Sequence, residues 1–111
     1  MKVAIIGSRN LTVNDLESYL PEGVTKIVSG GARGIDNCAG KYARANGLKL
    51  TEFFPEYDKY GRSAPLKRNL QIIEYADCVL AFWDGQSRGT KYVIDNCKKK
   101  NKKVSVFTIF S

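Results

Sequence analysis

The sequence predicts an α/β domain of three layers, in which a five-stranded parallel sheet is flanked by helices. Two observations carry this prediction: short apolar runs recur along the chain, and amphipathic segments with helical spacing separate them. This alternation is typical of strand–helix–strand units with right-handed crossovers. The chain has 111 residues, 43% of them hydrophobic, so we expect a single domain spanning residues 1–111.

Five apolar runs are expected to form the strands. Each is short and is bounded by glycine or by polar residues, as strands usually are. The expected strands cover residues 3–6, 26–29, 48–54, 78–83 and 104–109. Because parallel strands all end at one edge of the sheet, and ligands of such domains bind beyond that edge, the loops following the strands are the place to look for a site.

Four helical segments are expected between these strands. They cover residues 13–20, the segment from Gly34 to Gly47, the segment that begins at Pro65, and residues 90–100. Proline suits the first turn of a helix, and Asn46-Gly47 suits a helix end because both residues tolerate positive φ. The polar stretch from Pro55 to Ala64 is expected to be irregular.

Cysteine content and hydropathy narrow the class of protein. The three cysteines, Cys38, Cys78 and Cys97, are widely spaced, and the chain has no histidine, which argues against a metal site. We expect them to be small buried hydrophobes. The apolar runs are too short for a membrane span, and the N-terminal run is too short for a signal peptide, so a cytoplasmic protein without a membrane partner is expected.

Most of the net charge of +7 comes from one local run, because five lysines lie between residues 98 and 103. Such a run is able to contact nucleic acid. It also falls where the last helix should end, and cations there offset the helix dipole. We favour the solvated helix end, and nucleic acid is not the favoured partner.

Three loops rich in small residues follow the first, second and fourth strands. They are residues 7–9, 29–36 and 84–90. Glycine lets the backbone approach a ligand closely, and a helix that begins after such a loop offers unpaired N–H groups to phosphate. Each loop carries an arginine suited to bidentate contacts: Arg9, Arg33 and Arg88. None of the loops matches the Walker or G-x-G-x-x-G pattern, which argues against an NTPase.

Several other polar residues are candidates for the same site. Asp36 either contacts a ribose hydroxyl or offsets a helix dipole, and Asp84 is either a loop cap or a general base. The pair Arg68-Asn69 faces either the cleft or solvent, and on the residues alone solvent is slightly favoured. The candidate ligand-binding residues are Gly7, Ser8, Arg9, Ser29, Gly30, Gly31, Ala32, Arg33, Gly34, Asp36, Arg68, Asn69, Asp84, Gly85, Ser87, Arg88, Gly89 and Thr90.

Aromatic residues gather after the third strand and at the end of the fourth. Phe53, Phe54 and Trp83 are expected in the core or at the rim of the sheet. Tyr57 and Tyr60 lie in the segment expected to be irregular, and are therefore the better candidates for stacking on a base.

Nearly the whole chain, including these loops, resembles the SLOG superfamily of Rossmann-like domains. Residues 28–36, Val-Ser-Gly-Gly-Ala-Arg-Gly-Ile-Asp, look like the SGxAxGID signature of the DNA-processing protein DprA. Residues 7–9 are similar to the opening motif of the stand-alone YspA-like group. Arg68-Asn69 looks like the start of the DprA RNR motif, and residues 87–90 are similar to the Gly-Thr loop of the Lonely-guy phosphoribohydrolases.

The resemblance implies binding or sensing of a nucleotide or nucleotide-derived ligand by a homo-oligomer, most simply a homodimer, with no separate cofactor. Two departures bear on the alternatives. Val93 stands where the Lonely-guy enzymes carry a catalytic glutamate, which weighs against N-glycosidic cleavage by that route. Leu70 stands where the DprA motif has its second arginine, which weighs against DprA-like binding of single-stranded DNA.

Overall fold

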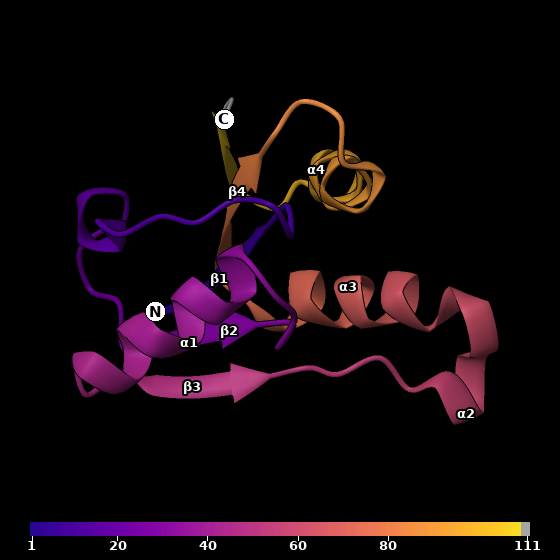
Figure 1. The fold of residues 1–111 in the computed structure, drawn as a ribbon, viewed down its shortest axis with the longest axis horizontal. Coiled ribbons are helices and arrows are strands. Elements are labelled where there is room, and N and C mark those ends of the chain that lie inside the picture. The colour runs from indigo at the N-terminus through magenta and orange to yellow at the C-terminus, as the bar shows by residue number, and fades with distance from the viewer. Residues whose placement is uncertain (110–111) are drawn as a thin grey trace.

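The computed structural model describes residues 1–109, and these form a three-layer, Rossmann-like α/β domain around one parallel sheet (Figure 1). The strands lie in the order β3-β2-β1-β4-β5, and every neighbouring pair is parallel. The predicted fold class is therefore confirmed. The strand bounds are β1 (Lys2–Gly7), β2 (Lys26–Ser29), β3 (Lys49–Glu52), β4 (Cys78–Trp83) and β5 (Val104–Thr108).

Helices cover both faces of the sheet. Helix α1 (Ile35–Ala45) packs on one face, while α3 (Ala64–Tyr75) and α4 (Arg88–Lys99) pack side by side on the other (Figure 1). Each helix returns the chain from the carboxyl ends of the strands to their amino ends, as parallel pairing requires. No helix within residues 1–109 is long and apolar enough to cross a membrane.

The core consists of two apolar clusters, one on each side of the sheet. Central strands β1 and β4 supply both clusters because their side chains alternate between the two faces. Cys78 and Cys97 are buried free thiols, as predicted, whereas Cys38 is half-buried. Burial raises the pKa of the Cys97 thiol to about 11, so this group stays protonated and behaves as a hydrophobe.

The helix predicted over residues 13–20 is wrong. The segment is mostly irregular and contains a single 3₁₀ turn, η1 (Leu16–Ser18). Val13 and Leu16 have the i, i+3 spacing of one helix face, but both are buried in the core together with Leu11, which precedes the segment. Packing these three side chains against the sheet selects the irregular path, and the Val13 N–H donates to the Cys38 sulfur at 3.4 Å.

The stretch from Pro55 to Ala64, predicted to be irregular, contains two short helical turns. These are α2 (Tyr57–Tyr60) and η2 (Gly61–Ser63), which lead directly into α3. The Ser63 hydroxyl donates to the Tyr60 carbonyl at 2.8 Å and joins the two turns. Helix α4 begins at Arg88 rather than at residue 90, because Ser87 is its N-cap.

Candidate functional site

A cavity of about 440 Å³ lies beyond the carboxyl ends of the strands, where the strand order changes direction between β1 and β4. This is the position expected for a ligand site in an open parallel sheet. It is large enough for a small ligand. The predicted site residues that line it are Gly7, Ser8, Arg9, Gly30, Ala32, Asp36, Arg68, Asn69, Ser87, Gly89 and Thr90.

Backbone contacts bring the three glycine-rich loops together. Gly34 has a φ of +68°, and a Cβ added there would lie 2.5 Å from the Arg9 carbonyl oxygen, so the second loop packs directly on the first. The Ser8 hydroxyl accepts a hydrogen bond from the Asp84 N–H at 3.2 Å, which ties the first loop to the third. The close approach of the loops therefore depends on residues that are small or that bond to backbone.

The second loop is held by its own polar groups. The Ser29 hydroxyl donates to the Asp36 carbonyl at 3.3 Å and accepts from the Gly31 N–H at 3.2 Å. Gly31 has a φ of +68° and is covered by the Phe54 ring, which would meet an added Cβ at 2.4 Å. Ser29 and Gly31 shape the loop, while the neighbouring Gly30 lines the cavity.

Arg68 is buried, with 7% of its surface exposed, although the sequence slightly favoured a solvent-facing pair. That interpretation is wrong because the backbone of the second loop provides acceptors that only the fold brings near. The Nη1 of Arg68 donates to the Gly30 carbonyl at 2.8 Å, and Nε donates to the Asn69 side-chain oxygen at 2.9 Å. Burial lowers the pKa of Arg68, and Asp36 opposes that shift.

Asp36 contributes a buried carboxyl group to the cavity, with 8% of the residue exposed. Burial raises the pKa of Asp36 from 3.8 to about 6, although the Ala32 N–H, Arg68 and Arg9 all favour the charged form. The Ala32 N–H donates to Oδ2 at 3.2 Å. Gly30 lies between the two buried groups, since a Cβ there would be 2.8 Å from Arg68 Nη1 and 2.9 Å from Asp36 Oδ2.

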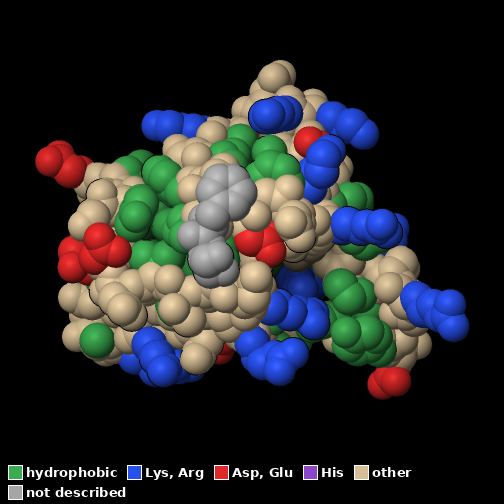
Figure 2. All heavy atoms as spheres, turned by 45° about the horizontal axis from the view of Figure 1, so that its top comes forward, with side chains coloured by type: hydrophobic (Ala, Val, Ile, Leu, Met, Phe, Trp, Pro, Cys, Tyr) green, Lys and Arg blue, Asp and Glu red, His purple; other side chains and the backbone are tan. Residues whose placement is uncertain are grey.

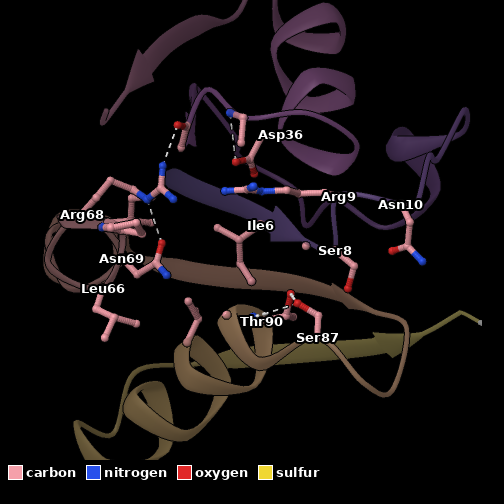
Figure 3. A pocket seen from close by; sticks show the side chains of 17 residues that line it. Ile6, Ser8, Arg9, Asn10, Asp36, Leu66, Arg68, Asn69, Ser87 and Thr90 are labelled. Carbon is pink, nitrogen blue, oxygen red and sulfur yellow. Dashed lines mark hydrogen bonds between the residues drawn. The ribbon is translucent and has the colours of Figure 1, made fainter. Parts of the chain in front are cut away.

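Arg9 makes the cavity electropositive. Figure 3 shows its side chain reaching over Ile6 toward Arg68, and Arg9 contributes to lowering the pKa of Arg68. The ionisable side chains in the lining are therefore two guanidinium groups and one carboxyl group. An anion entering this cavity would meet a surplus of positive charge. Arg9 is exposed, whereas Arg68 is buried and lies where charge interactions are stronger than in water.

The first turn of α4 forms the opposite wall of the cavity. Gly89 and Thr90 line it together with Ser87, whose side chain accepts from the Thr90 N–H at 3.5 Å (Figure 3). The N–H groups of a first helical turn have no partner within the helix, and they carry the positive end of its dipole. Ser87 takes up the Thr90 N–H, so this wall offers an anion the Gly89 N–H, the Ser87 and Thr90 hydroxyls and the positive end of the dipole.

Asp84 is a loop cap, as one of its two interpretations held. Its Oδ1 accepts from the Gln86 N–H at 2.9 Å and from the Ser87 N–H at 2.7 Å, and these bonds lower its pKa. The carboxylate thereby holds the turn that presents the start of α4. It does not line the cavity.

Seven of the predicted site residues lie outside the cavity lining: Ser29, Gly31, Arg33, Gly34, Asp84, Gly85 and Arg88. Arg33 and Arg88 are exposed. A position next to a glycine does not ensure that an arginine side chain points into the cavity. The geometry of the turn decides which residue of the loop faces it.

Most of the lining that the sequence did not predict is apolar. The lining residues that were missed are Ile6, Asn10, Pro65, Leu66, Ile72 and Val93. Leu66 is 39% exposed beside the cavity. Ile6, Ile72 and Val93 are buried members of the core that also reach the cavity. A pattern of apolar residues does not distinguish these two roles.

The aromatic residues after β3 lie away from this lining. Phe53 packs against Tyr75 with ring centroids 5.5 Å apart, as expected of a rim residue. Phe54 is 59% exposed, so of its two predicted places the core is wrong; its ring lies at the rim of the sheet, where it covers Gly31. Tyr57 and Tyr60 belong to α2 and are not part of the lining, so stacking of either on a base stays a prediction.

The chain is similar to the Gene 61 protein of Mycobacterium phage D29. The two are 33% identical over a 79-residue alignment that covers 66% of this chain and 63% of that protein. The matched region thus spans less than two thirds of the relative's length. No family model matches the chain, and no solved structure matches it.

Proposed function

We propose that this chain binds a nucleotide or a nucleotide-derived ligand and holds its phosphate at the carboxyl edge of the sheet. One observation carries the proposal: Arg9, Arg68 and the first turn of α4 converge on a cavity that also has apolar walls. The motif resemblance to the SLOG superfamily, in which we place the chain, points to the same ligand class. It also suggests a cytoplasmic homo-oligomer.

The two kinds of wall match the two parts of a nucleotide. The phosphate fits near Gly89 and Thr90, where N–H donors, hydroxyls and helix dipole coincide. The sugar and base fit against the side chains of Ile6, Ile72 and Val93, which offer no hydrogen bonds and exclude water. A nucleoside without phosphate gains the second set of contacts and loses the first.

Isothermal titration calorimetry with purine nucleoside monophosphates and the matching nucleosides tests this proposal. We expect the monophosphate to bind at least tenfold more tightly. Arg9→Ala should weaken monophosphate binding by about 1–3 kcal/mol, which is typical of a lost charge-assisted hydrogen bond. Arg44→Ala is the matched control, because Arg44 is exposed and does not line the cavity.

The same titrations separate the arginines predicted from the sequence. The sequence predicts a loss of similar size for Arg33→Ala and Arg88→Ala, whereas the cavity lining predicts it for Arg9. Equal affinity for nucleoside and nucleotide, or unchanged affinity in Arg9→Ala, would count against a phosphate site in this cavity.

Cleavage of a nucleotide is the second candidate function, and Asp36 is the observation that favours it. A buried carboxyl group with a pKa of about 6 is suited to exchange a proton near neutral pH. Two other carboxylates that could take this role lie elsewhere: Asp84 caps its loop, and Glu74 is exposed and pairs with Lys100 at 3.9 Å. In this reaction the bond between the sugar carbon and the base would break, the Asp36 carboxyl would give its proton to the departing base, and water would add to the sugar carbon and return a proton to Asp36.

Chromatography of nucleoside monophosphates incubated with the protein distinguishes the two functions. Release of free base that disappears in Asp36→Asn would establish the hydrolase. Tight binding without release of base would favour a binding or sensing role. Val93, which stands at the position of the Lonely-guy catalytic glutamate, favours that role because a valine side chain transfers no proton.

A further inference from the structure

Lysines collect at the amino edge of the sheet, opposite the cavity. Lys2, Lys26 and Lys49 are the first residues of β1, β2 and β3, and the strand register pairs Lys2 with Lys26 and Lys26 with Lys49. Residues paired in register point to the same face, and neighbouring strands lie about 4.8 Å apart. The three lysines therefore form a row across the start of the sheet.

Tyr75, at the end of α3, connects this row to the lysine run at residues 98–103. The Lys26 ammonium donates to the Tyr75 hydroxyl at 2.7 Å, and the Lys2 ammonium lies 4.3 Å from the centre of its ring. On the other side, the Lys102 ammonium donates to the carbonyl of Ala76, the next residue along the chain. Segments far apart in sequence thus form one basic surface.

We call this surface the lysine edge. It consists of Lys2, Lys26, Lys49, Lys98, Lys99, Lys100, Lys102 and Lys103.

Few carboxylates balance the lysine edge. Glu74 lies 3.9 Å from Lys100, Asp77 accepts from the Lys2 N–H at 2.7 Å, and Glu22 is exposed in the turn before β2. Asp95 is the fourth, since Lys98 and Lys99 help to lower its pKa. Eight lysines thus face four carboxylates, so this edge accounts for most of the net charge of +7. Figure 2 shows Lys and Arg side chains at several separate places around the molecule, with Asp and Glu side chains between them.

We propose that the lysine edge binds the phosphate backbone of a single-stranded nucleic acid. A row of ammonium groups matches a linear polyanion, whose charges repeat every few ångströms, better than it matches one compact phosphate. An anionic membrane fits less well, because surface helices and anchors insert apolar side chains. Of the exposed large hydrophobic residues in residues 1–109, Met1 lies at this edge, Val106 lies in the middle of β5, and Phe54, Tyr57 and Leu66 follow the carboxyl ends of the strands.

This surface is separate from the nucleotide cavity. Helix α4 begins at the cavity and ends at the lysine run, and its 12 residues span about 18 Å. Arg68 and the lysine run therefore do not form one compact site. The inference goes beyond the proposed function and does not depend on it.

Fluorescence anisotropy with a labelled 20-nucleotide single-stranded DNA or RNA tests the inference. If about four phosphates are neutralised, affinity should fall about 50-fold between 50 mM and 200 mM salt. The triple variant Lys49→Glu, Lys99→Glu, Lys103→Glu should lose at least tenfold in affinity at 50 mM salt. The matched control is Lys41→Glu, Lys59→Glu, Lys67→Glu, which changes the net charge equally at exposed positions outside the edge; it should lose less than threefold.

Four outcomes would overturn the inference: no oligonucleotide binding at 50 mM salt, equal losses in the two triple variants, displacement of the oligonucleotide by excess nucleoside monophosphate, or stronger binding to vesicles of three parts phosphatidylcholine to one part phosphatidylserine. Far-ultraviolet circular dichroism confirms that both triple variants are folded. If calorimetry detects no nucleotide binding, the proposed function is wrong, but the inference that the lysine edge binds nucleic acid is unaffected.

Discussion

The two edges of the sheet use charge in opposite ways. At the carboxyl edge Asp36 and Arg68 are buried and are held by backbone groups of a tight loop. At the amino edge most of the lysines are exposed, and they act together through their number. The carboxyl edge should therefore respond to small changes of geometry, whereas the amino edge should respond to salt and total charge. Three matched pairs of variants, one member at each edge, test this difference.

The largest expected difference is between two glycines of positive φ. Gly34→Ala should lower the free energy of unfolding by about 3 kcal/mol or more. The added Cβ would clash with the Arg9 backbone, and alanine would also have to adopt a positive φ that it disfavours. Gly47→Ala, at the end of α1, meets no atom within 4 Å and should cost about 1 kcal/mol. Urea denaturation measures both, and equal losses would show that the loops at the carboxyl edge are not tightly packed.

The second pair should show opposite pH dependence. The pKa of Asp36 is raised from 3.8 to about 6 in the folded protein, so between these values the folded state binds the proton and the unfolded state does not. The contribution of Asp36 to the free energy of unfolding is thus fully present below about pH 4. It is lost as the pH rises to about 6, and the loss amounts to at most about 3 kcal/mol. Asp36→Asn should abolish that decline. Arg68 and Arg9 favour the charged form of Asp36, and Glu52 opposes it.

Asp77, at the amino edge, should behave in the reverse sense. The Lys2 N–H lowers the pKa of Asp77, so the stability it contributes is present above its ordinary pKa of 3.8 and is lost as pH falls through the lowered value. Asp77→Asn should therefore lower the free energy of unfolding at neutral pH, and this free energy should then decrease less on acidification than in the unmodified protein. Urea titrations from pH 3 to 8 follow both variants, and a parallel pH dependence in the two would contradict the assignment.

The smallest expected effects concern the two ends of α4. Ser87→Ala removes the N-cap at the carboxyl edge and should cost about 1 kcal/mol, with little dependence on salt. Lys99→Ala removes a cation from the last turn and should cost about 0.3 kcal/mol at low salt and less at high salt. Thermal denaturation at 20 mM and 500 mM NaCl measures both, and a strong salt dependence for Ser87→Ala would argue against simple capping.

Local chemistry made much of the fold predictable. The strands at residues 26–29 and 78–83 were predicted with the observed bounds, because their apolar runs end at glycine or acidic residues. Residues 13–20 were misjudged, since Val13 and Leu16 have helical spacing although contacts with the sheet decide their positions. The one-turn helix α2 was missed for a related reason, as a single turn has no periodicity to detect.

By itself, the sequence determined the alternation of strands and helices, and hence the edge at which its glycine-rich loops gather. Periodicity and small residues are local properties that one stretch of chain carries alone. Only the tertiary structure decided that Arg68 is buried against Gly30, that Arg33 and Arg88 lie outside the cavity, and that Lys2, Lys26 and Lys49 form a row. These outcomes depend on register and on acceptors from distant segments, because a buried charge or a charged row exists only where the folded chain brings its partners together.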